Sequence, residues 1–573
     1  MNKSNMTGLA IMAVASAAVI AVSGPAYNAI QESRLKAAAG GQETTTAAGE
    51  AEGYGGPILA ELTLAGDKII DLKLSGDKET PEIGGAALNT LKEAILEKGS
   101  LEGVDAVSGA TWTSKGVFAA VQSAMGIEKA EEPASDASEE AVTASGLYHG
   151  LGFFSNGRLG PGKDDTDTGV YSFNEVVAYV LFDEEGRILD LEVDQLEVAT
   201  PNYDGEHMPH LTGFPGQSYN ADEDHDEKVD AVLEQTEDTF LAEVDGWATK
   251  RERGSTYKLG SGTWEEEMDV FEETFKGMTI EEVKQWYADN CSDLNGKPLH
   301  GTSDKEEDIK KYEALSDEAK AGLDAISSAT MSLNDAHGNI LGALERAYES
   351  RKPVDADSVA KIGLGFTNTG RLGPGKDDTD TGVYSFNTQA AGACFDADGK
   401  IVALYTDVME IATPNYDGEH MPHLTGFPGQ SYNADEDHDE KVDTVLEQTD
   451  DTFLAEIEGW KTKRERGSTY KLGSGTWQDE MNIFEEAFKG LTADEVSTWF
   501  DTYCSDLNGK PLHGTSDKEE DVKKYEALSD EQKGEMDAIS GATMSLKDAH
   551  GDILGAIVKS WENAKSSNIS VSK

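Results

Sequence analysis

The chain has 573 residues, with 109 Asp and Glu against 48 Lys and Arg, so its formal net charge is -61 at pH 7. Such a surface repels phosphate backbones and anionic lipid headgroups, which excludes nucleic acid as a partner and argues against peripheral binding to acidic membranes. The 3 cysteines form no CxxC or CxxCH spacing, which excludes attached c-type haem, a cysteine-ligated iron–sulfur cluster and a zinc ribbon.

The N-terminal segment, residues 1–27, contains an apolar run from Gly8 to about Gly24. The run is long for the core of a signal peptide and slightly short for a membrane span, so both a cleaved signal and a retained anchor remain open. We favour the anchor. In either case we expect an exported protein, which is secreted or held on the outer face of the cell membrane through this segment only.

Residues 28–52, rich in Ala, Gly, Thr and Glu, are predicted to be a linker. A first domain is expected at 53–127. Alternating apolar residues on both sides of a turn at Gly66 and Asp67 predict an antiparallel hairpin with one buried face. Helices are expected from about 86 to 97 and after residue 111. An acidic linker, residues 128–145, follows.

From residue 146 the chain doubles, because the segment that begins at Arg158 returns at Arg371, an offset of 213 residues. A period of this length indicates duplicated domains. We predict a first large copy at 146–350 and a second large copy at 359–565, joined by a linker at 351–358 and followed by a tail at 566–573. Each copy begins with the same hairpin, closes with the same loop and helix, and carries a long insertion between them. The expected fold class is α+β, with three related domains.

A loop of small residues ends each of the three domains. Its sequence is DAVSGAT at 105–111, DAISSAT at 324–330 and DAISGAT at 537–543. Thr113 or Ser114, and the S-x-x-D patterns of the large copies, predict N-caps for the helices that follow. The threonine that ends each loop is therefore expected just ahead of a helix N-terminus, where free N–H groups and the helix dipole stabilise a phosphate ester.

These loops resemble those of FMN-binding domains that carry FMN covalently, through a phosphoester to the threonine of a D-x-x-S/T-G-A-T motif. Residues 53–126 match this family along their full length, and the large copies resemble a subgroup with a long insertion. The resemblance implies up to three covalent FMN groups, on Thr111, Thr330 and Thr543. It implies these further cofactor-site residues: Asp105, Ser108, Gly109, Ala110, Asp324, Ser327, Ser328, Ala329, Asp537, Ser540, Gly541, Ala542, Glu79 and Thr80.

The resemblance also implies roles for some of these residues. Asp105, Asp324 and Asp537 would position the nucleotide or metal of the modifying enzyme, or cap the loop. Ser328 departs from the motif, because it places a Cβ where the backbone freedom of glycine is expected. We therefore expect Thr330 to be modified less efficiently than Thr111 and Thr543.

The implied partners are an FMN transferase that uses FAD and a membrane electron donor linked to quinone or NADH. We predict a flavoprotein that relays electrons from this donor to extracytoplasmic acceptors, because a tethered cofactor is not lost by dilution outside the cell. An extracytoplasmic FMN-dependent reductase of a small acceptor and a non-flavinylated binding protein remain alternatives. No catalytic residue is assigned, and it stays open whether the chain is an enzyme.

Other polar clusters recur in the two large copies. Paired histidines and acidic runs, as at 207–210 and 222–227, are predicted to be solvated loops, and no metal site is assigned. The basic groups at 250–253 and 463–466 are predicted to pair with carboxylates of the protein itself, with a flavin phosphate or a neighbouring domain as the alternative.

Overall fold

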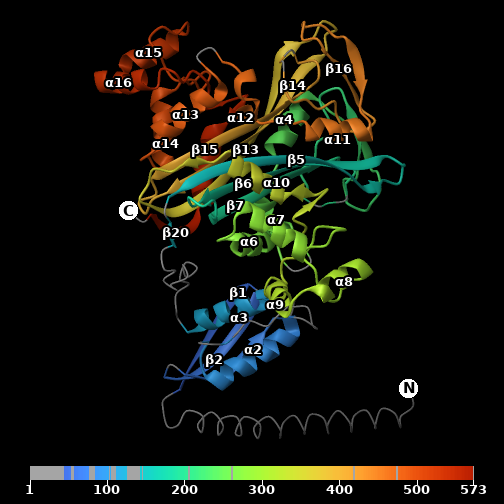
Figure 1. Cartoon of the computed structure of the whole chain (residues 1–573), viewed down its shortest axis with the longest axis vertical. Coiled ribbons are helices and arrows are strands. Elements are labelled where there is room, and N and C mark those ends of the chain that lie inside the picture. The colour runs from blue at the N-terminus through green and yellow to red at the C-terminus, as the bar shows by residue number, and fades with distance from the viewer. Residues whose placement is uncertain are drawn as a thin grey trace, which may run out of the picture. The chain divides into compact units, whose positions relative to one another are not determined.

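The computed structural model describes these residues: 44–52, 57–66, 68–76, 84–101, 104, 111–125, 142–144, 146–203, 205, 207–259, 262–416, 418, 420–472 and 475–571. The chain divides into two compact units, residues 1–137 and 138–573, which are described separately (Figure 1). The segment predicted to be a signal or anchor lies outside the described residues. Among the helices that are described, none combines the length and the apolar character needed to cross a membrane.

The first unit is a three-stranded antiparallel sheet with two helices. The strands lie in the order β1 (Thr44–Glu52), β2 (Pro57–Ala65), β3 (Lys68–Ser75), and the helices are α2 (Gly84–Lys98) and α3 (Thr111–Ala124). Alternate residues of β2, beginning with Ile58, are buried against one face of α3, which includes Val117 and Val121. The predicted hairpin and both helices are confirmed.

Residues 44–52, predicted to belong to a linker, instead form β1 and pair along their whole length with β2. The amino-acid composition of this segment is typical of a linker, but here the small residues allow the strand to pack closely against α3. A Cβ on Gly49 would lie 2.3 Å from the carbonyl oxygen of Ala120, so the helix backbone rests directly on the strand. A run of Ala, Gly and Thr can therefore be a closely packed strand as well as a flexible connection.

The second unit contains both large copies, each with the same sheet and closing helix. In the first copy these are β5 (Tyr148–Lys163), β6 (Gly169–Phe182), β7 (Ile188–Ala199) and α10 (Ile340–Glu349). In the second they are β13 (Ser358–Lys376), β14 (Gly382–Phe395), β15 (Ile401–Ala412) and α17 (Ile553–Glu562). Neighbouring strands within each set of three are antiparallel.

The insertions supply most of the remaining helices. In the first copy these are α4 (Glu237–Asp245), α5 (Lys250–Arg253), α6 (Trp264–Phe275), α7 (Ile280–Asn290), α8 (Glu306–Ala314) and α9 (Asp317–Ala325). Their counterparts are α11 (Asp450–Glu458), α12 (Lys463–Arg466), α13 (Trp477–Ala487), α14 (Ala493–Tyr503), α15 (Glu519–Ala527) and α16 (Asp530–Ala538). Two hairpins also belong to them: β8 (Ser218–Ala221) with β9 (Ala231–Glu234), and β16 (Ser431–Ala434) with β17 (Thr444–Glu447).

The two sheets lie face to face, and helices cover their outer faces (Figure 1). On β6, Val177 and Tyr179 point into the shared layer between the sheets, whereas Val176 and Val180 point outward to α6, α7 and α10. Because both faces of the sheet are covered, β6 is buried at nearly every position.

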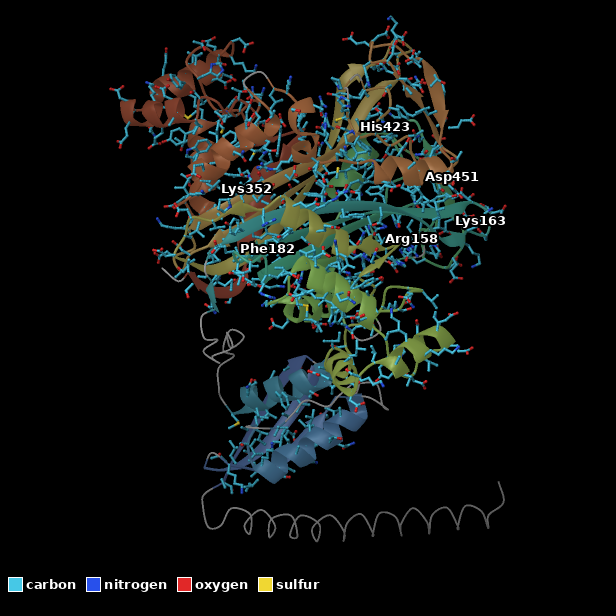
Figure 2. The ribbon with its side chains drawn as sticks, viewed as in Figure 1. Arg158, Lys163, Phe182, Lys352, His423 and Asp451 are labelled. Atoms are coloured by element: carbon cyan, nitrogen blue, oxygen red, sulfur yellow. The ribbon has the colours of Figure 1, made fainter. Side chains whose placement is uncertain are left out.

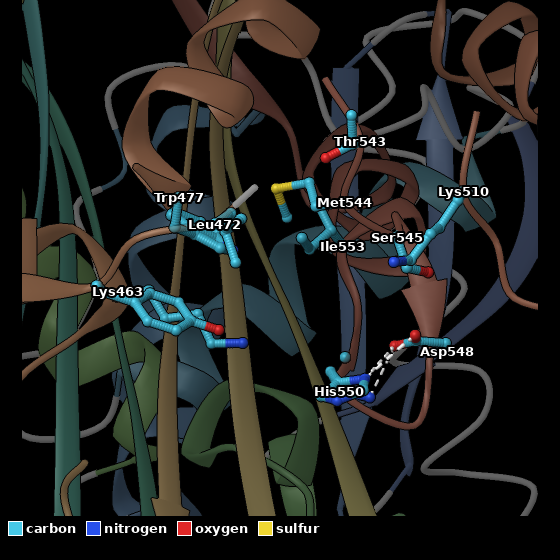
Figure 3. Close-up of a pocket in the computed structure, with 12 residues that line it drawn as sticks. Lys463, Leu472, Trp477, Lys510, Thr543, Met544, Ser545, Asp548, His550 and Ile553 are labelled. Carbon is cyan, nitrogen blue, oxygen red and sulfur yellow. Dashed lines mark hydrogen bonds and ion pairs between the residues drawn. The ribbon is translucent and has the colours of Figure 1, made fainter. Parts of the chain in front are cut away.

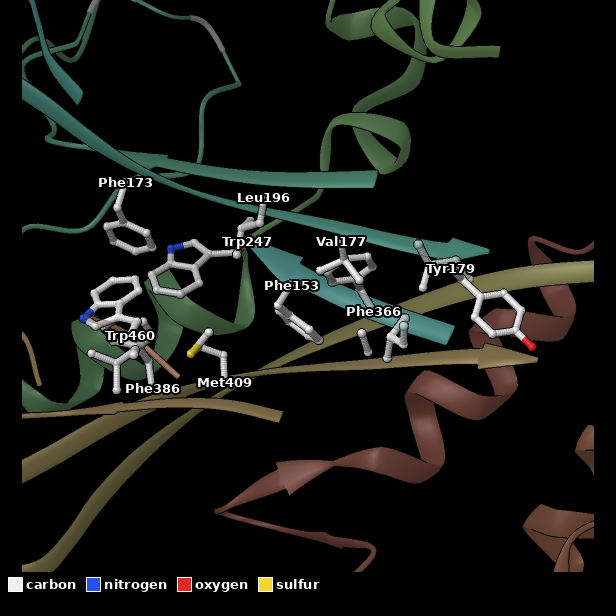
Figure 4. Close-up of a cluster of buried hydrophobic side chains, with 14 of the residues drawn as sticks. Phe153, Phe173, Val177, Tyr179, Leu196, Trp247, Phe366, Phe386, Met409 and Trp460 are labelled. Atoms are coloured by element: carbon white, nitrogen blue, oxygen red, sulfur yellow. The ribbon is translucent and has the colours of Figure 1, made fainter. Parts of the chain in front are cut away.

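The two copies meet through equivalent residues. Phe173 stacks on its counterpart Phe386, and Trp247 and Trp460 each pack edge-on against the phenylalanine of the other copy, with ring centroids 5.2 and 5.4 Å apart (Figure 4). Nε2 of Gln217 donates to the carbonyl oxygen of Thr425 at 2.8 Å, and Gln430 makes the reciprocal bond at 2.8 Å. Such reciprocal contacts are typical of a two-fold interface, formed here within one chain.

The insertions also reach across this interface. Helix α4 of the first copy packs on β13 of the second, and α11 packs on β5. A Cβ on Gly157 of β5 would lie 2.9 Å from Ile457 of α11, and one on Gly370 of β13 would lie 2.9 Å from Leu241 of α4. Each copy therefore completes the core of the other.

Three other predicted connections contain strands. The acidic linker includes β4 (Val142–Ala144), the linker at 351–358 includes β12 (Lys352–Pro353), and the tail is largely β20 (Lys565–Val571). β20 joins the sheet of the second copy between β13 and β4. Its Ile569 is 2% exposed, so one apolar side chain of this otherwise polar segment packs into the core. These segments form strands because an existing sheet edge supplies their hydrogen bonds.

Candidate functional site

The predicted loops of the large copies occupy equivalent places. Each begins in the last turn of a helix, α9 or α16, and then turns sharply. In the first copy the N–H of Ala329 donates to the carbonyl oxygen of Ile326 at 2.8 Å, and Ala542 makes the same bond to Ile539. Asp324, Ser327, Asp537 and Ser540 are exposed, whereas Ala329 and Ala542 are buried and fix the loop to the core.

A glutamate holds the threonine that ends each loop. Glu480 accepts hydrogen bonds from the backbone N–H of Thr543 at 2.7 Å and of Met544 at 2.8 Å, and the Thr543 hydroxyl lies 3.1 Å from both carboxylate oxygens. Glu267 binds Thr330 and Met331 in the same way, with distances of 2.6 to 3.2 Å. Both glutamates are 1% exposed. The loop is thus an anion-binding turn with a hydroxyl beside the anion.

The sequence prediction missed both glutamates. They stand in the first turns of α6 and α13, directly after an acidic residue that completes a capping box, Glu266 with Thr263 and Asp479 with Thr476. In a run of three acidic residues such as 265–267, nothing local marks the one that turns inward. The recurrence of Trp264 and Glu267 as Trp477 and Glu480 was the available signal.

The predicted caps of the closing helices are wrong in the large copies. A short antiparallel pair, β10 (Asn334–Asp335) with β11 (Gly338–Asn339) or β18 (Lys547–Asp548) with β19 (Gly551–Asp552), separates the loop from the helix. The N-caps are Asn339 and Asp552. The N–H groups that bind an anion near each threonine therefore belong to the loop itself.

A pocket of about 210 Å³ opens beside Thr543. Figure 3 shows Trp477 and Leu472 on one side, with Ser545, Asp548 and His550 on the other. Tyr470, Lys463 and Lys510 also line it. The pocket thus combines aromatic walls, two cations and an exposed threonine whose hydroxyl contacts Glu480.

Ion pairs fix two of the charged groups in this pocket. Lys463 lies 3.0 Å from Glu410, and both are buried. Burial opposes the charge of Lys463, but Glu410 outweighs it and the pKa of the lysine ends above its usual value. Likewise, burial alone would raise the pKa of Asp548, but hydrogen bonds from His550 lower it below the usual value.

The first copy has an equivalent pocket of about 160 Å³. Eleven of its twelve lining residues are the counterparts of residues that line the pocket beside Thr543, and these eleven are Lys250, Tyr257, Leu259, Trp264, Lys297, Met331, Ser332, Asp335, His337, Gly338 and Ile340. The twelfth is Gln195, and Thr330 itself borders the pocket only through its neighbour Met331. The structure therefore places the same aromatic and cationic groups beside both threonine loops.

The loop also accommodates Ser328. Its counterpart Gly541 is not in the left-handed region, and a Cβ there would meet one atom, Cδ1 of Ile483, at 2.8 Å. In the first copy this isoleucine is replaced by Val270, which lacks that carbon. The expected loss of backbone freedom is therefore the wrong physical argument. Gly541 is needed only because the Ile483 side chain leaves no room for a Cβ, and Val270 leaves that room for Ser328 in the first copy.

In the small domain the motif lies mostly outside the described residues, including Asp105, Ser108, Gly109 and Ala110. Glu79 and Thr80 lie outside them too. Thr111 is the first residue of α3. Thr113 and Ser114, predicted as N-caps, are instead buried inside the first turns of this helix.

Clusters of acidic residues form in both insertions. Asp222, Asp224 and Asp226 bring ligand atoms within 4.8 Å of one another, as do Asp435, Asp437 and Asp443. Two of the three residues in each cluster are exposed, and such groups are common without an ion. The assignment of no metal site stays a prediction.

The family of the first unit is shown by comparison with known proteins. Residues 53–126 match the model of the FMN-binding domain. The protein contains an FMN-binding domain. The matched span begins after β1, which completes the sheet of this FMN-binding domain.

Two curated proteins are similar to parts of the chain. A chlorophenol reductase of Desulfitobacterium hafniense is 34% identical over 194 residues, which are 32% of this chain and 52% of the relative. An NADH:acrylate oxidoreductase of Vibrio harveyi is 22% identical over 315 residues, 54% of this chain and 29% of the relative. The chain thus spans about half or less of the length of these relatives.

Proposed function

We propose that the protein is an electron-transfer flavoprotein that carries FMN through a phosphoester on Thr111, Thr330 and Thr543. The observation that carries the proposal is the shared environment of Thr330 and Thr543. In each, a buried glutamate accepts from the hydroxyl and from two neighbouring backbone N–H groups, and the loop borders a pocket with aromatic and cationic walls.

The residues present fit the two parts of FMN. The N–H groups of Thr543 and Met544, which bind a carboxylate in this structure, suit a phosphate oxygen, and Lys510 adds positive charge. The half-buried Tyr470 and Leu472 provide surface for a flat, partly apolar ring, and the buried Trp477 supports this wall from behind. When bound, FMN supplies the redox chemistry, and the protein orients it and sets its electrostatic surroundings.

Glu480 and Glu267 are placed to assist the modification. In the transfer that we propose, the threonine oxygen forms a bond to the phosphorus of the FMN half of FAD, the bond to AMP breaks, and the hydroxyl proton passes to the glutamate. A hydroxyl within 3.1 Å of the carboxylate has the geometry that such a proton transfer needs. The FAD and its transferase come from outside this chain.

Mass spectrometry of the intact protein, made in its native host or together with a flavin transferase, tests the proposal. We expect three FMN adducts, one of which is lost in each of Thr111→Ala, Thr330→Ala and Thr543→Ala. A protein without any adduct on these threonines would overturn the proposal and leave the non-flavinylated binding protein.

A reductase of a small acceptor is the second candidate. It is favoured by the names of the two relatives, a chlorophenol reductase and an NADH:acrylate oxidoreductase. Stopped-flow reduction of the loaded protein, followed by addition of soluble acceptors, separates the two functions. Multiple turnovers with one acceptor indicate a reductase, and oxidation limited to the electrons stored on the flavins indicates a carrier.

Export and attachment to the outer face of a membrane remain part of the proposed function. A covalent cofactor suits a protein that cannot recover a lost flavin from solution. Proteolysis of intact cells tests this location. Digestion of the chain without lysis is the expected result, and full protection until lysis contradicts it.

A further inference from the structure

A partly buried charge cluster lies behind the wall of each pocket. In the first copy Cζ of Arg251 is 5.8 Å from the ring centroid of Trp264, and in the second Cζ of Arg464 is 5.6 Å from the ring centroid of Trp477. Each tryptophan lines its pocket. The charges around the two arginines therefore act on whatever occupies the two pockets from the same direction.

The cations of the two clusters are the same. Lys565, which follows the closing helix of the second copy, lies 2.8 Å from Asp269 in the cluster of Arg251. Its counterpart Lys352, labelled in Figure 2, lies 3.0 Å from Glu485 in the cluster of Arg464. Each cluster thus holds one arginine and one lysine, and the lysine comes from the end of the other copy.

The carboxylates differ. The guanidinium of Arg251 lies 2.7 Å from Glu272, 2.8 Å from Asp269, 3.5 Å from Glu265 and 3.8 Å from Glu192. Of the described carboxylates, Glu485 alone, the counterpart of Glu272, forms an ion pair with the guanidinium of Arg464.

The other three positions are neutral in the second copy. Tyr405 replaces Glu192, Gln478 replaces Glu265 and Asn482 replaces Asp269. Asn482 accepts from Arg464 at 2.9 Å and from Lys352 at 2.8 Å, so it keeps the geometry of the aspartate without its charge. The two pockets are thus alike in shape and unlike in the charge behind them.

Protonation of buried carboxylates reduces the difference in negative charge between the two clusters but does not remove it. Burial, together with the nearby Glu272, raises the pKa of Glu192 to about 8, and burial raises the pKa of Glu272 as well, so this pair of carboxyl groups favours sharing a proton. Burial would also raise the pKa of Asp269, but Arg251 and Lys565 bring it below the usual value. Asp269 and Glu265, both about half-exposed, are carboxylates behind the pocket of the first copy whose counterparts behind the pocket of the second copy, Asn482 and Gln478, carry no charge.

We propose that these clusters set different reduction potentials at the two pockets, lower at Thr330 and higher at Thr543. This inference rests on the proposed function. Reduced FMN carries negative charge at neutral pH, and nearby carboxylates disfavour it while uncompensated cations favour it. Reducing equivalents then collect on the Thr543 side. Each electron that leaves the FMN on Thr330 is gained by the FMN on Thr543, so no further oxidant is needed. The accompanying protons exchange with water through the open pockets.

Potentiometric titration of single-flavin proteins tests the ordering. The variants are Thr111→Ala/Thr543→Ala, which leaves Thr330, and Thr111→Ala/Thr330→Ala, which leaves Thr543. Intact mass first shows that each carries one FMN; a missing adduct counts against the proposed function. With both loaded, we expect the lower midpoint potential for the protein flavinylated on Thr330. Equal potentials, or the reverse order, overturn the inference.

Exchange of the charged positions supplies the second readout. Glu265→Gln/Asp269→Asn is expected to raise the potential at Thr330, and Gln478→Glu/Asn482→Asp to lower the potential at Thr543. Neutralising two exposed residues of α11, Asp451→Asn/Glu458→Gln, is the control and should move both potentials less. Glu265→Gln alone serves if the double variant folds poorly. Unchanged potentials in folded exchange variants overturn the assignment.

Discussion

Phe173 and Phe386 stack with ring centroids 5.5 Å apart and an interplanar angle of 12°, although they are counterparts 213 positions apart. A residue that contacts its own counterpart lies close to a two-fold axis. The duplicated halves are therefore arranged as a symmetric dimer is, with the flavin-type pockets at equivalent places on either half.

Phe173→Ala and Phe386→Ala should each destabilise the whole unit 138–573. Both rings are fully buried in the shared core, so each change should lower the free energy of unfolding by about 3–5 kcal/mol. Urea unfolding followed by tryptophan fluorescence checks this. Leu372→Ala, at an exposed position, is the control and should change it by about 0.5 kcal/mol or less. Separate unfolding of one copy in either variant would contradict a shared core.

Glu480→Gln should slow the attachment of FMN to Thr543. Glutamine keeps an oxygen for the N–H groups of the loop but is a far weaker proton acceptor, and loss of a general base costs about 100-fold or more in rate. Timed incubation with FAD and a flavin transferase, followed by peptide mass spectrometry, measures the rate.

Thr330, with Glu267 intact, is the internal control in the same molecule. Its rate should not change in Glu480→Gln, and the reciprocal Glu267→Gln should slow Thr330 alone. Equal rates at Thr543 in the wild type and in Glu480→Gln would show that the glutamate does not take the proton.

Gly541→Ser should reproduce the loop of the first copy at a cost. The new Cβ meets Cδ1 of Ile483 at 2.8 Å, and such crowding costs about 1 kcal/mol when the neighbour is a flexible side chain. Adding Ile483→Val should restore both the melting temperature and the extent of flavinylation at Thr543. A loss that the valine does not repair would point to the backbone instead.

Glu175→Gln should make the stability less dependent on pH. The side chain is fully buried in the shared core, and neither carboxylate oxygen has a hydrogen-bond partner of good geometry among the described residues. Burial raises the pKa of Glu175 to about 7 from its usual 4.5, while the Thr388 hydroxyl acts weakly in the opposite direction. Above pH 4.5 the unfolded chain loses this proton first.

The contribution of Glu175 is therefore fully present below about pH 4.5 and is lost as the pH rises toward 7, by at most about 3 kcal/mol. Unfolding measured from pH 4.5 to 8 should show the decline in the wild type and a weaker one in Glu175→Gln. Glu234→Gln, at an exposed position, is the control. Parallel pH profiles for wild type and Glu175→Gln would contradict the prediction.

The sequence by itself determined the local features of this protein. Alternating apolar residues predicted the hairpin of β2 and β3, the periodicity of Val117 and Val121 predicted the buried face of α3, and the offset of 213 residues predicted equivalent copies. The motifs at 324–330 and 537–543 located Thr330 and Thr543, because the residues that shape a short loop are adjacent in the sequence.

The tertiary structure decided the features that depend on distant residues. Glu480 and Thr543 lie 63 positions apart, and nothing local distinguishes Glu480 from the acidic residue beside it that only caps a helix. Strands β1 and β20 form because a sheet edge and a closely packed helix accept sequences that resemble linkers. The unequal charges around Arg251 and Arg464 became visible only once folding had placed them behind equivalent pockets, since an electrostatic field depends on distance in space and not on separation along the chain.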